Sequence, residues 1–182
     1  YKTWADLEAK LKAEPKGLVE TIGIGTIPHF VGALLADAVG FETRKVAASS
    51  GADRSKALLG GHADIALFSA AEYIKWREAG MRALVFFGPN RVEKIKEVPT
   101  ARELGYDVTW ANPNWWLAPK GTPQERIDVI ANAFKEIMAD PEIQTWFSDR
   151  VLDPYWTDGE QARAESNELL VKLQEAAKTI KK

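Results

Sequence analysis

The chain has 182 residues, 46% of them hydrophobic and 27% charged, a composition typical of a folded domain with a sizeable core. Its net charge of −2 comes with no basic block, which argues against nucleic acid as a partner. The absence of cysteine excludes disulfides and thiolate metal sites, and no apolar run reaches the roughly 18 residues that span a bilayer.

Strands and helices are predicted to alternate along the first part of the chain. Thr3 is a predicted N-cap for a helix that ends at Ala13. A β-branched strand, Leu18–Ile24, precedes a helix that begins at Ile27 and ends at Gly40. Further strands are predicted at residues 41–47, 63–68 and 82–87, with a short helix that ends at residue 59 and another at residues 72–79 between them. This alternation favours an α/β fold with a mostly parallel sheet.

The second part of the chain is predicted to be helical. Thr100 and Glu103 have the spacing of a capping box that opens a short helix, and residues 108–111 are expected to be extended. Thr122 is a predicted N-cap followed by proline, and further helices are expected at residues 140–147 and from Thr157 onward. From about residue 113 the chain therefore supplies helices with apolar faces but hardly any strands, so these helices need a sheet from elsewhere.

Three loops that follow predicted strands could bind a small anion. They are Gly23–Thr26, Ala48–Gly51 and Phe68–Ala71. In open α/β sheets ligands bind at the carboxyl ends of the strands, where helix N-termini present free N–H groups to a carboxylate. Glycine allows close approach of the backbone, and Ser or Thr adds a hydroxyl donor. Each loop taken alone is more often a plain β–α turn, so the prediction depends on all three.

Two charged or titratable side chains lie near these loops. His29 could donate to a ligand or pack against the neighbouring loop, and Arg54 could bind a carboxylate in bidentate fashion or be a solvated helix charge. Dinucleotide and P-loop motifs are absent, and two histidines without cysteine give no zinc motif. A hydrolase built from Ser49 or Ser50 with His29 and Asp53 would lack the Gly-x-Ser-x-Gly elbow.

The order of short motifs resembles the substrate-binding proteins of tripartite tricarboxylate transporters, the TctC-like Bug family. Gly25–His29 resembles that family's Gly-Ser-x-x-His loop. Residues 46–64 resemble its Val-Pro-Tyr-Lys-Gly-Gly segment, which ends in Leu-Leu-Gly-Gly-x-x-Asp. The pattern continues in order through Ala79-Gly80, Arg82-Ala83-Leu84, Arg91, Val98-Pro99-Thr100, Glu103-x-Gly105, Ala118 to Pro123 and Asp140-Pro141-Glu142. The resemblance covers nearly the whole chain.

This resemblance implies a periplasmic, two-lobed binding protein that closes on a small carboxylate, with no catalysis, metal or cofactor, and that works with integral membrane transporter components. It implies a type II periplasmic-binding-protein lobe at residues 1–112 and the returning C-terminal helices of the other lobe at residues 113–182. The N-terminal half of that other lobe would come from a missing segment or another chain. The ligand-binding residues that it implies together with the loop analysis are Gly25, Thr26, Ile27, His29, Ser49, Ser50, Gly51, Arg54 and Ser69.

Two departures leave the identity of the ligand open. Ala47-Ala48-Ser49 replaces the family's Pro-Tyr-Lys, and Pro113-Asn114-Trp115-Trp116 replaces its Trp-Tyr-Gly stretch. The alternative interpretations are the effector-binding sensor domain of a transcription regulator, which has the same two-lobed architecture, and an α/β hydrolytic enzyme.

Overall fold

The computed structural model describes residues 1–110, 113–152 and 155–180. The chain divides into two compact units, one formed by Tyr1–Ala111 with Leu173–Lys182 and the other by Asn112–Lys172. The predicted domain boundary after residue 112 falls at residues 111–112, outside the described residues. The assignment of residues 1–112 and 113–182 to two lobes stays a prediction.

A small parallel sheet forms the centre of the first unit. Its strands are β1 (Leu18–Ile22), β2 (Thr43–Ala47) and β3 (Ile65–Ala66), in the order β2-β1-β3. Both neighbours pair with β1 in parallel, which confirms the predicted α/β fold with a parallel sheet. Four of the five residues of the central strand are buried, whereas β2 at the edge is mostly exposed.

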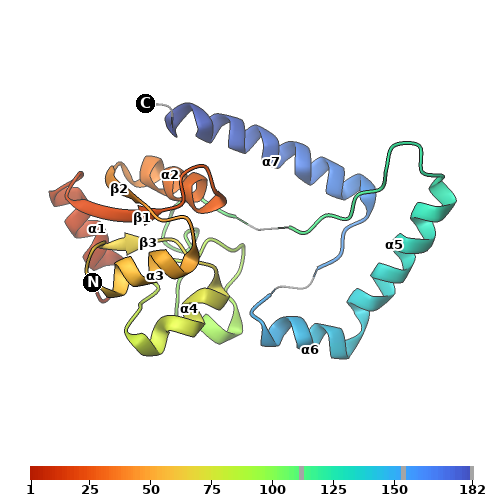
Figure 1. Ribbon diagram of the computed structural model, residues 1–182, viewed down its shortest axis with the longest axis horizontal. Coiled ribbons are helices and arrows are strands. Elements are labelled where there is room, and N and C mark those ends of the chain that lie inside the picture. The colour runs from red at the N-terminus through yellow and green to blue at the C-terminus, as the bar shows by residue number, and fades with distance from the viewer. Residues whose placement is uncertain (111–112, 153–154, 181–182) are drawn as a thin grey trace. The chain divides into compact units, whose positions relative to one another are not determined.

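Helices alternate with the strands along the chain (Figure 1). They are α1 (Trp4–Ala13), α2 (Ile27–Val39), α3 (Gly51–Leu59) and α4 (Ala70–Trp76). Of these, α1, α2 and α3 each begin or end where the sequence predicts. The helix predicted at residues 72–79 begins two residues earlier and ends as α-helix at Trp76, after which Arg77–Ala79 forms a 3₁₀ turn. Thr3 and Asp6 form a capping box at the start of α1, and Gly40 ends α2 in the left-handed conformation that glycine adopts without strain. Residues of α1, β1 and α2 pack into one core with Phe41, Phe87, Ala101 and Val108.

The predicted strands are longer than the observed ones, and one of them does not form. β1 ends at Ile22, two residues early, and β3 contains only two residues. Residues 82–87, predicted as a fourth strand, make a single parallel bridge between Phe86 and Thr100. The partner segment includes Pro99, which has no N–H to donate, so this ladder cannot extend past it. The apolar residues of this predicted strand pack in the core instead: Phe87 is part of the core, and Leu84 and Val85 pack against it.

The segment at Thr100 also differs from its prediction. The capping box forms, since Glu103 Oε2 accepts from Thr100 N at 2.7 Å and Thr100 Oγ1 accepts from Glu103 N at 3.2 Å. The predicted helix does not follow, and residues 101–105 form turns. Gly105 has φ +90°, and this left-handed residue reverses the chain after one turn. Two single 3₁₀ turns, η1 (Arg77–Ala79) and η2 (Glu93–Ile95), lie in the same part of the chain.

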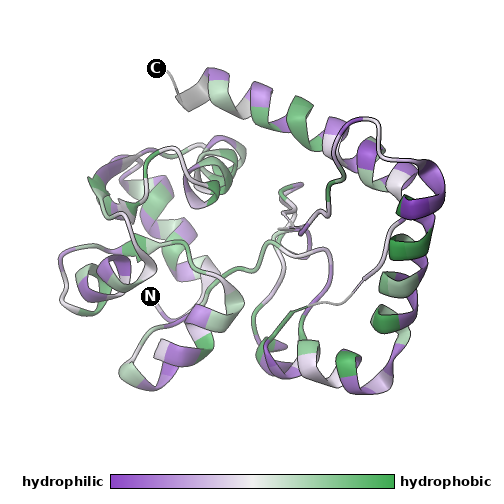
Figure 2. Ribbon diagram, turned by 45° about the vertical axis from the view of Figure 1, so that its right-hand side comes forward, coloured by the Kyte–Doolittle hydropathy of each residue, from purple (hydrophilic) through white to green (hydrophobic). Residues whose placement is uncertain are grey.

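Three helices follow: α5 (Gln124–Ala139), α6 (Pro141–Asp149) and α7 (Gly159–Ile180). Figure 2 shows hydrophobic and hydrophilic residues alternating along them. The predicted cap at Thr122 is wrong, because Pro123 occupies the cap position and Thr122 Oγ1 donates to Pro119 O instead. Asp140 caps α6 as its position predicts. Within the described residues, no helix combines the length and apolarity needed to cross a membrane.

Candidate functional site

The loops that follow β1, β2 and β3 all lie at the carboxyl edge of the sheet, because the strands are parallel. A cavity of about 200 Å³ opens between the first two loops. Thr26 and Ser49, both predicted ligand-binding residues, line it, and the remaining lining residues are Ile22, Gly23, Ile24, Ala47 and Ala48. The cavity therefore brings the first two predicted loops together at the position that α/β sheets use for ligands.

The first loop is held in shape by its own polar groups. Thr26 Oγ1 donates to Gly23 O at 2.5 Å, and Gly25 has a left-handed φ of +79°. His29 is buried, and its Nδ1 accepts from Gly25 N at 3.1 Å, so this side chain packs against the loop. Ile27 begins α2 with an exposed side chain, and its N–H donates to no acceptor among the described residues.

The second loop leads into α3 through a capped helix start. Ser50 Oγ accepts from Asp53 N at 3.1 Å and donates to Asp53 Oδ2 at 2.7 Å. Gly51 is the first residue of the helix, and Ser55 Oγ donates to its carbonyl at 2.8 Å. The first N–H groups of α3 have no partner within the helix and carry its partial positive charge. Ser49 is exposed on the cavity wall and free of hydrogen bonds to the described residues.

Arg54 is buried, with only 7% of its surface exposed. The alternative that it is a solvated helix charge is therefore wrong. Its guanidinium carbon lies 5.5 Å from the centre of the Phe68 ring, and its Nε is buried with no hydrogen-bond partner. The nearest carboxylate oxygen is Glu72 Oε1, 3.9 Å from Nη2. Arg54 is therefore a buried cation next to the N-terminus of α3, with one side-chain donor that has no hydrogen-bond partner among the described residues.

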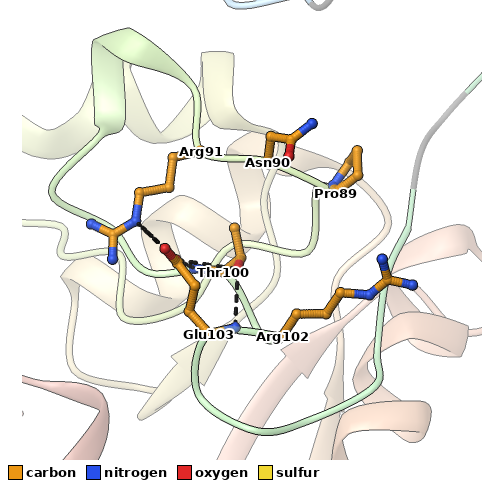
Figure 3. Close-up of a pocket in the computed structure, with 6 residues that line it drawn as sticks. All are labelled: Pro89, Asn90, Arg91, Thr100, Arg102 and Glu103. Carbon is orange, nitrogen blue, oxygen red and sulfur yellow. Dashed lines mark hydrogen bonds and ion pairs between the residues drawn. The ribbon is translucent and has the colours of Figure 1, made fainter.

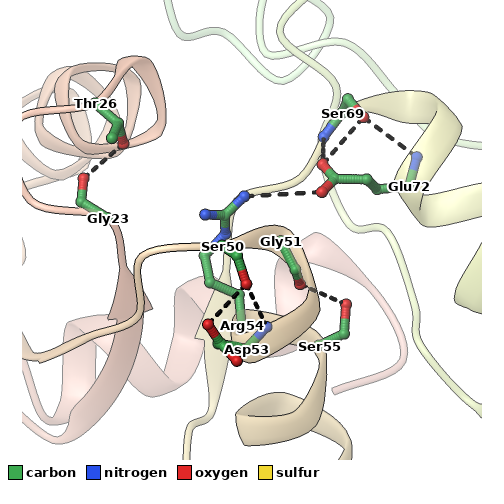
Figure 4. A network of polar contacts seen from close by, with 9 residues as sticks. All are labelled: Gly23, Thr26, Ser50, Gly51, Asp53, Arg54, Ser55, Ser69 and Glu72. Atoms are coloured by element: carbon green, nitrogen blue, oxygen red, sulfur yellow. Dashed lines mark hydrogen bonds and ion pairs between the residues drawn. The ribbon is translucent and has the colours of Figure 1, made fainter.

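The third loop brings in Glu72, a residue that the sequence reasoning missed. Ser69 caps α4, and Glu72 Oε2 accepts from Ser69 N at 3.0 Å and from its Oγ at 3.1 Å (Figure 4). The other oxygen, Oε1, lies so close to the start of α3 that a Cβ on Gly51 would clash with it. The Ser-x-x-Glu spacing of a capping box was the available signal, but only the folded chain shows that this carboxylate also reaches α3.

A second, larger cavity of about 330 Å³ lies away from the strand ends (Figure 3). Its lining is Pro89, Asn90, Arg91, Thr100, Arg102 and Glu103. Arg91 Nε donates to both oxygens of Glu103 at 2.9 and 2.8 Å, and Arg102 pairs with Asp107 at 3.4 Å. The hydrogen bond from Arg91, followed by that from Thr100 N, lowers the pKa of the Glu103 carboxyl. Since its charged groups pair with each other, we interpret this region as structural.

The hydrogen bonds at the main site do not form a hydrolytic triad. Ser50 pairs with Asp53, and His29 Nδ1 accepts a hydrogen bond from Gly25 N. Among the described residues, no hydrogen bond joins a serine to a histidine. The same part of the chain holds no group of three His, Asp or Glu side chains placed to bind a metal ion.

Comparison with known proteins gives one family. The pattern of the tripartite tricarboxylate transporter family receptor, TctC, matches residues 1–180. The chain belongs to this family. A curated relative from Cupriavidus necator, "UPF0065 protein in gbd 5'region", is 28% identical over 186 residues, which cover 100% of this chain and 53% of the relative. The family expectation drawn from the motif order is thus confirmed.

Solved structures agree in fold. A TctC solute binding protein from Polaromonas without ligand has a TM-score of 0.78 and 21% identity, and it matches over 100% of this chain and 62% of its own. The R. palustris protein Rpa4515 with adipate has a TM-score of 0.78 and 19% identity, over 98% of this chain and 61% of its own. The chain therefore spans about half to three fifths of the length of these relatives.

Proposed function

We propose that this protein is a periplasmic solute-binding protein that captures a small carboxylate and delivers it to the membrane components of a tripartite transporter. The observation that carries the proposal is the convergence of three loops at one sheet edge, with the cavity beside Ser49 and the buried Arg54 near the start of α3. Membership in a receptor family supports the transport role, and the adipate bound by one structural neighbour supports the ligand class.

Binding would rely on hydrogen bonds and one positive charge rather than on a cofactor. The N–H of Ile27 at the start of α2, the N–H groups of Gly51 and Ala52 at the start of α3 and the Ser49 hydroxyl have no hydrogen-bond partner among the described residues and could donate to a ligand. Arg54 offers a fork of N–H donors to a carboxylate. Gly25 and His29 would shape the first loop around the ligand. The proposed ligand-binding set remains Gly25, Thr26, Ile27, His29, Ser49, Ser50, Gly51, Arg54 and Ser69.

The proposal includes no enzymatic activity, because no hydrogen bond among the described residues pairs a serine nucleophile with a histidine base. The family match favours a transport receptor over the sensor domain of a transcription regulator. An export signal in the complete gene product would agree with the proposed periplasmic location.

The test uses the complete protein as its gene encodes it. Mass spectrometry of the purified protein after denaturation should release a small carboxylic acid, whose binding is then measured by calorimetry. Because hydrogen bonds to an ionised acceptor contribute about 1.5–3 kcal/mol, Ser49→Ala should weaken binding by roughly tenfold or more. The exposed Ser148 lies in α6 of the second unit, outside the three loops of the proposed site, and Ser148→Ala is the matched control.

An affinity that is unchanged by Ser49→Ala, and also by changes at Thr26, Ser50 and Ser69, would show that the ligand binds elsewhere. Turnover of an ester or amide that Ser50→Ala abolishes would instead establish an enzyme.

A further inference from the structure

The carboxylate of Glu72 lies between two of the three loops. One oxygen, Oε2, is held at the start of α4 by the N–H and hydroxyl of Ser69. The other, Oε1, faces the start of α3, where Gly51 has no side chain to exclude it. Figure 4 shows the Arg54 guanidinium reaching up between these loops toward Glu72. An acidic side chain of the protein therefore occupies the region where a ligand carboxylate is expected.

This position has the chemistry of a carboxylate site for two independent reasons. The nine-residue helix α3 begins at Gly51, which lies next to Glu72 Oε1, and the N-terminus of this helix carries a partial positive charge. Arg54 is more than nine-tenths buried and has an unpaired Nε, although a guanidinium can form two parallel hydrogen bonds with a carboxylate. Burying such a donor without an acceptor is unfavourable unless a ligand completes it.

Glu72 fills this position incompletely. Its Oε1 lies 3.9 Å from Arg54 Nη2, which is an ion pair but too long for a hydrogen bond. No hydrogen bond from the described residues reaches Oε1, whereas Oε2 has two. The charge of Arg54 is thus balanced, while its hydrogen-bonding capacity stays unused.

We propose that Arg54 and the N-terminus of α3 form a subsite for a ligand carboxylate, and that Glu72 is the internal carboxylate that occupies it until the ligand binds. The proposal rests on the proposed function and adds a residue that determines affinity and specificity. Two carboxylates beside one guanidinium repel each other, so Glu72 must move aside when an anionic ligand enters. Displacing the Glu72 carboxylate therefore costs binding free energy. Acids that form further contacts with the protein can supply this free energy, whereas simple monoacids cannot.

The test is Glu72→Gln in the complete protein, with acetate, succinate and adipate as calorimetric probes. Glutamine also serves in capping boxes, so this variant keeps the contact with Ser69 and removes only the charge. The expected result is about tenfold tighter binding of the dicarboxylates, equivalent to about 1.4 kcal/mol, and measurable binding of acetate. Glu78→Gln removes the same charge from an exposed position six residues along and should leave affinity unchanged.

The second part of the experiment measures the variant Arg54→Gln by the same calorimetry. This substitution should weaken binding of the dicarboxylates, and adding Glu72→Gln to it should recover much less than tenfold, because the two residues act through one subsite. Unchanged or weaker binding in Glu72→Gln, with the wild type still binding a dicarboxylate, overturns the subsite while the proposed function stands. Weaker binding would specifically mean that Glu72 contacts a donor group of the ligand. If neither protein binds any carboxylate, the proposed function fails and the subsite fails with it.

Discussion

At the scale of single residues, His29 determines the shape of the first ligand loop. Its ring is buried at the start of α2, and Nδ1 accepts the Gly25 N–H at 3.1 Å, while Gly25 itself has a left-handed backbone. A second bond, from Thr26 Oγ1 to Gly23 O, closes the same turn. The loop that we place against the ligand is therefore organised before the ligand arrives, which lowers the entropic cost of binding.

Replacing His29 with leucine should lower the free energy of unfolding by about 1 kcal/mol, because the Gly25 N–H loses its acceptor. Asparagine at the same position keeps an acceptor close to that of Nδ1 and should recover much of the loss. Urea unfolding of the two variants and the wild type measures the difference. Equal stability of His29→Leu and His29→Asn would show that only the volume of the ring matters.

The residues of the site differ in how far the sequence could predict them. The caps at Ser50 and Ser69 are local, since each serine contacts an acid three residues further on. The burial of Arg54 depends on contacts with residues distant in sequence, because its guanidinium lies near the Phe68 ring and the Glu72 carboxylate. A spacing rule predicts the first kind of contact, whereas only the folded chain shows the second.

At the scale of elements, helices were predicted more accurately than strands. A helix start depends on side chains within one turn, so the boundaries of α1 and α2 followed from Thr3 and Gly40. A strand depends on its partner, and residues 82–87 have the apolar composition of a strand but pair only at Phe86. Residues 88–110 follow as turns and 3₁₀ structure. Without a strand partner, the conformation of this segment depends on contacts between its own side chains and backbone.

One of these contacts joins Arg91, Thr100 and Glu103. Arg91 also donates from Nη1 to Lys96 O at 2.7 Å, so the cluster ties together residues on both sides of η2. The hydrogen bond from Arg91 is the largest cause of the lowered pKa of Glu103. The stability that this carboxylate contributes is therefore present above its ordinary value of 4.5 and is lost as the pH falls through its lower value in the folded state.

Glu103→Gln should accordingly reduce stability near neutral pH, and the difference from the wild type should shrink as the pH falls well below 4.5. Urea midpoints measured across that range test the prediction. Glu97→Gln removes a charge from the same segment outside this cluster and serves as the control. A difference that stays constant down to low pH would assign the role of Glu103 to shape and not to charge.

At the scale of the whole molecule, the second unit leaves large apolar side chains exposed. Trp116 and Leu117 are 77% and 89% exposed, and Val129 and Ile130 on α5 are 70% and 57% exposed. The ring of Trp116 contacts that of Phe134 of α5 in a tilted arrangement, with centroids 4.4 Å apart, so part of this apolar surface is already organised. Exposed apolar patches of this kind are found where another chain or segment packs. The sequence predicts that this region packs against something else, because it supplies apolar helix faces and hardly any strands.

We therefore expect the 182-residue chain, expressed by itself, to self-associate through α5, unless an additional segment or another chain covers these residues. Ile130 and Ile137 lie seven residues apart on one face of α5 and are both exposed, so the double change of Ile130 and Ile137 to glutamate should shift the light-scattering mass toward that of a monomer. Leu59→Glu places a charge on an exposed leucine of the first unit and should leave association unchanged. A stable, monodisperse monomer of the unchanged chain would contradict the prediction, since it would mean that these residues tolerate water without a partner.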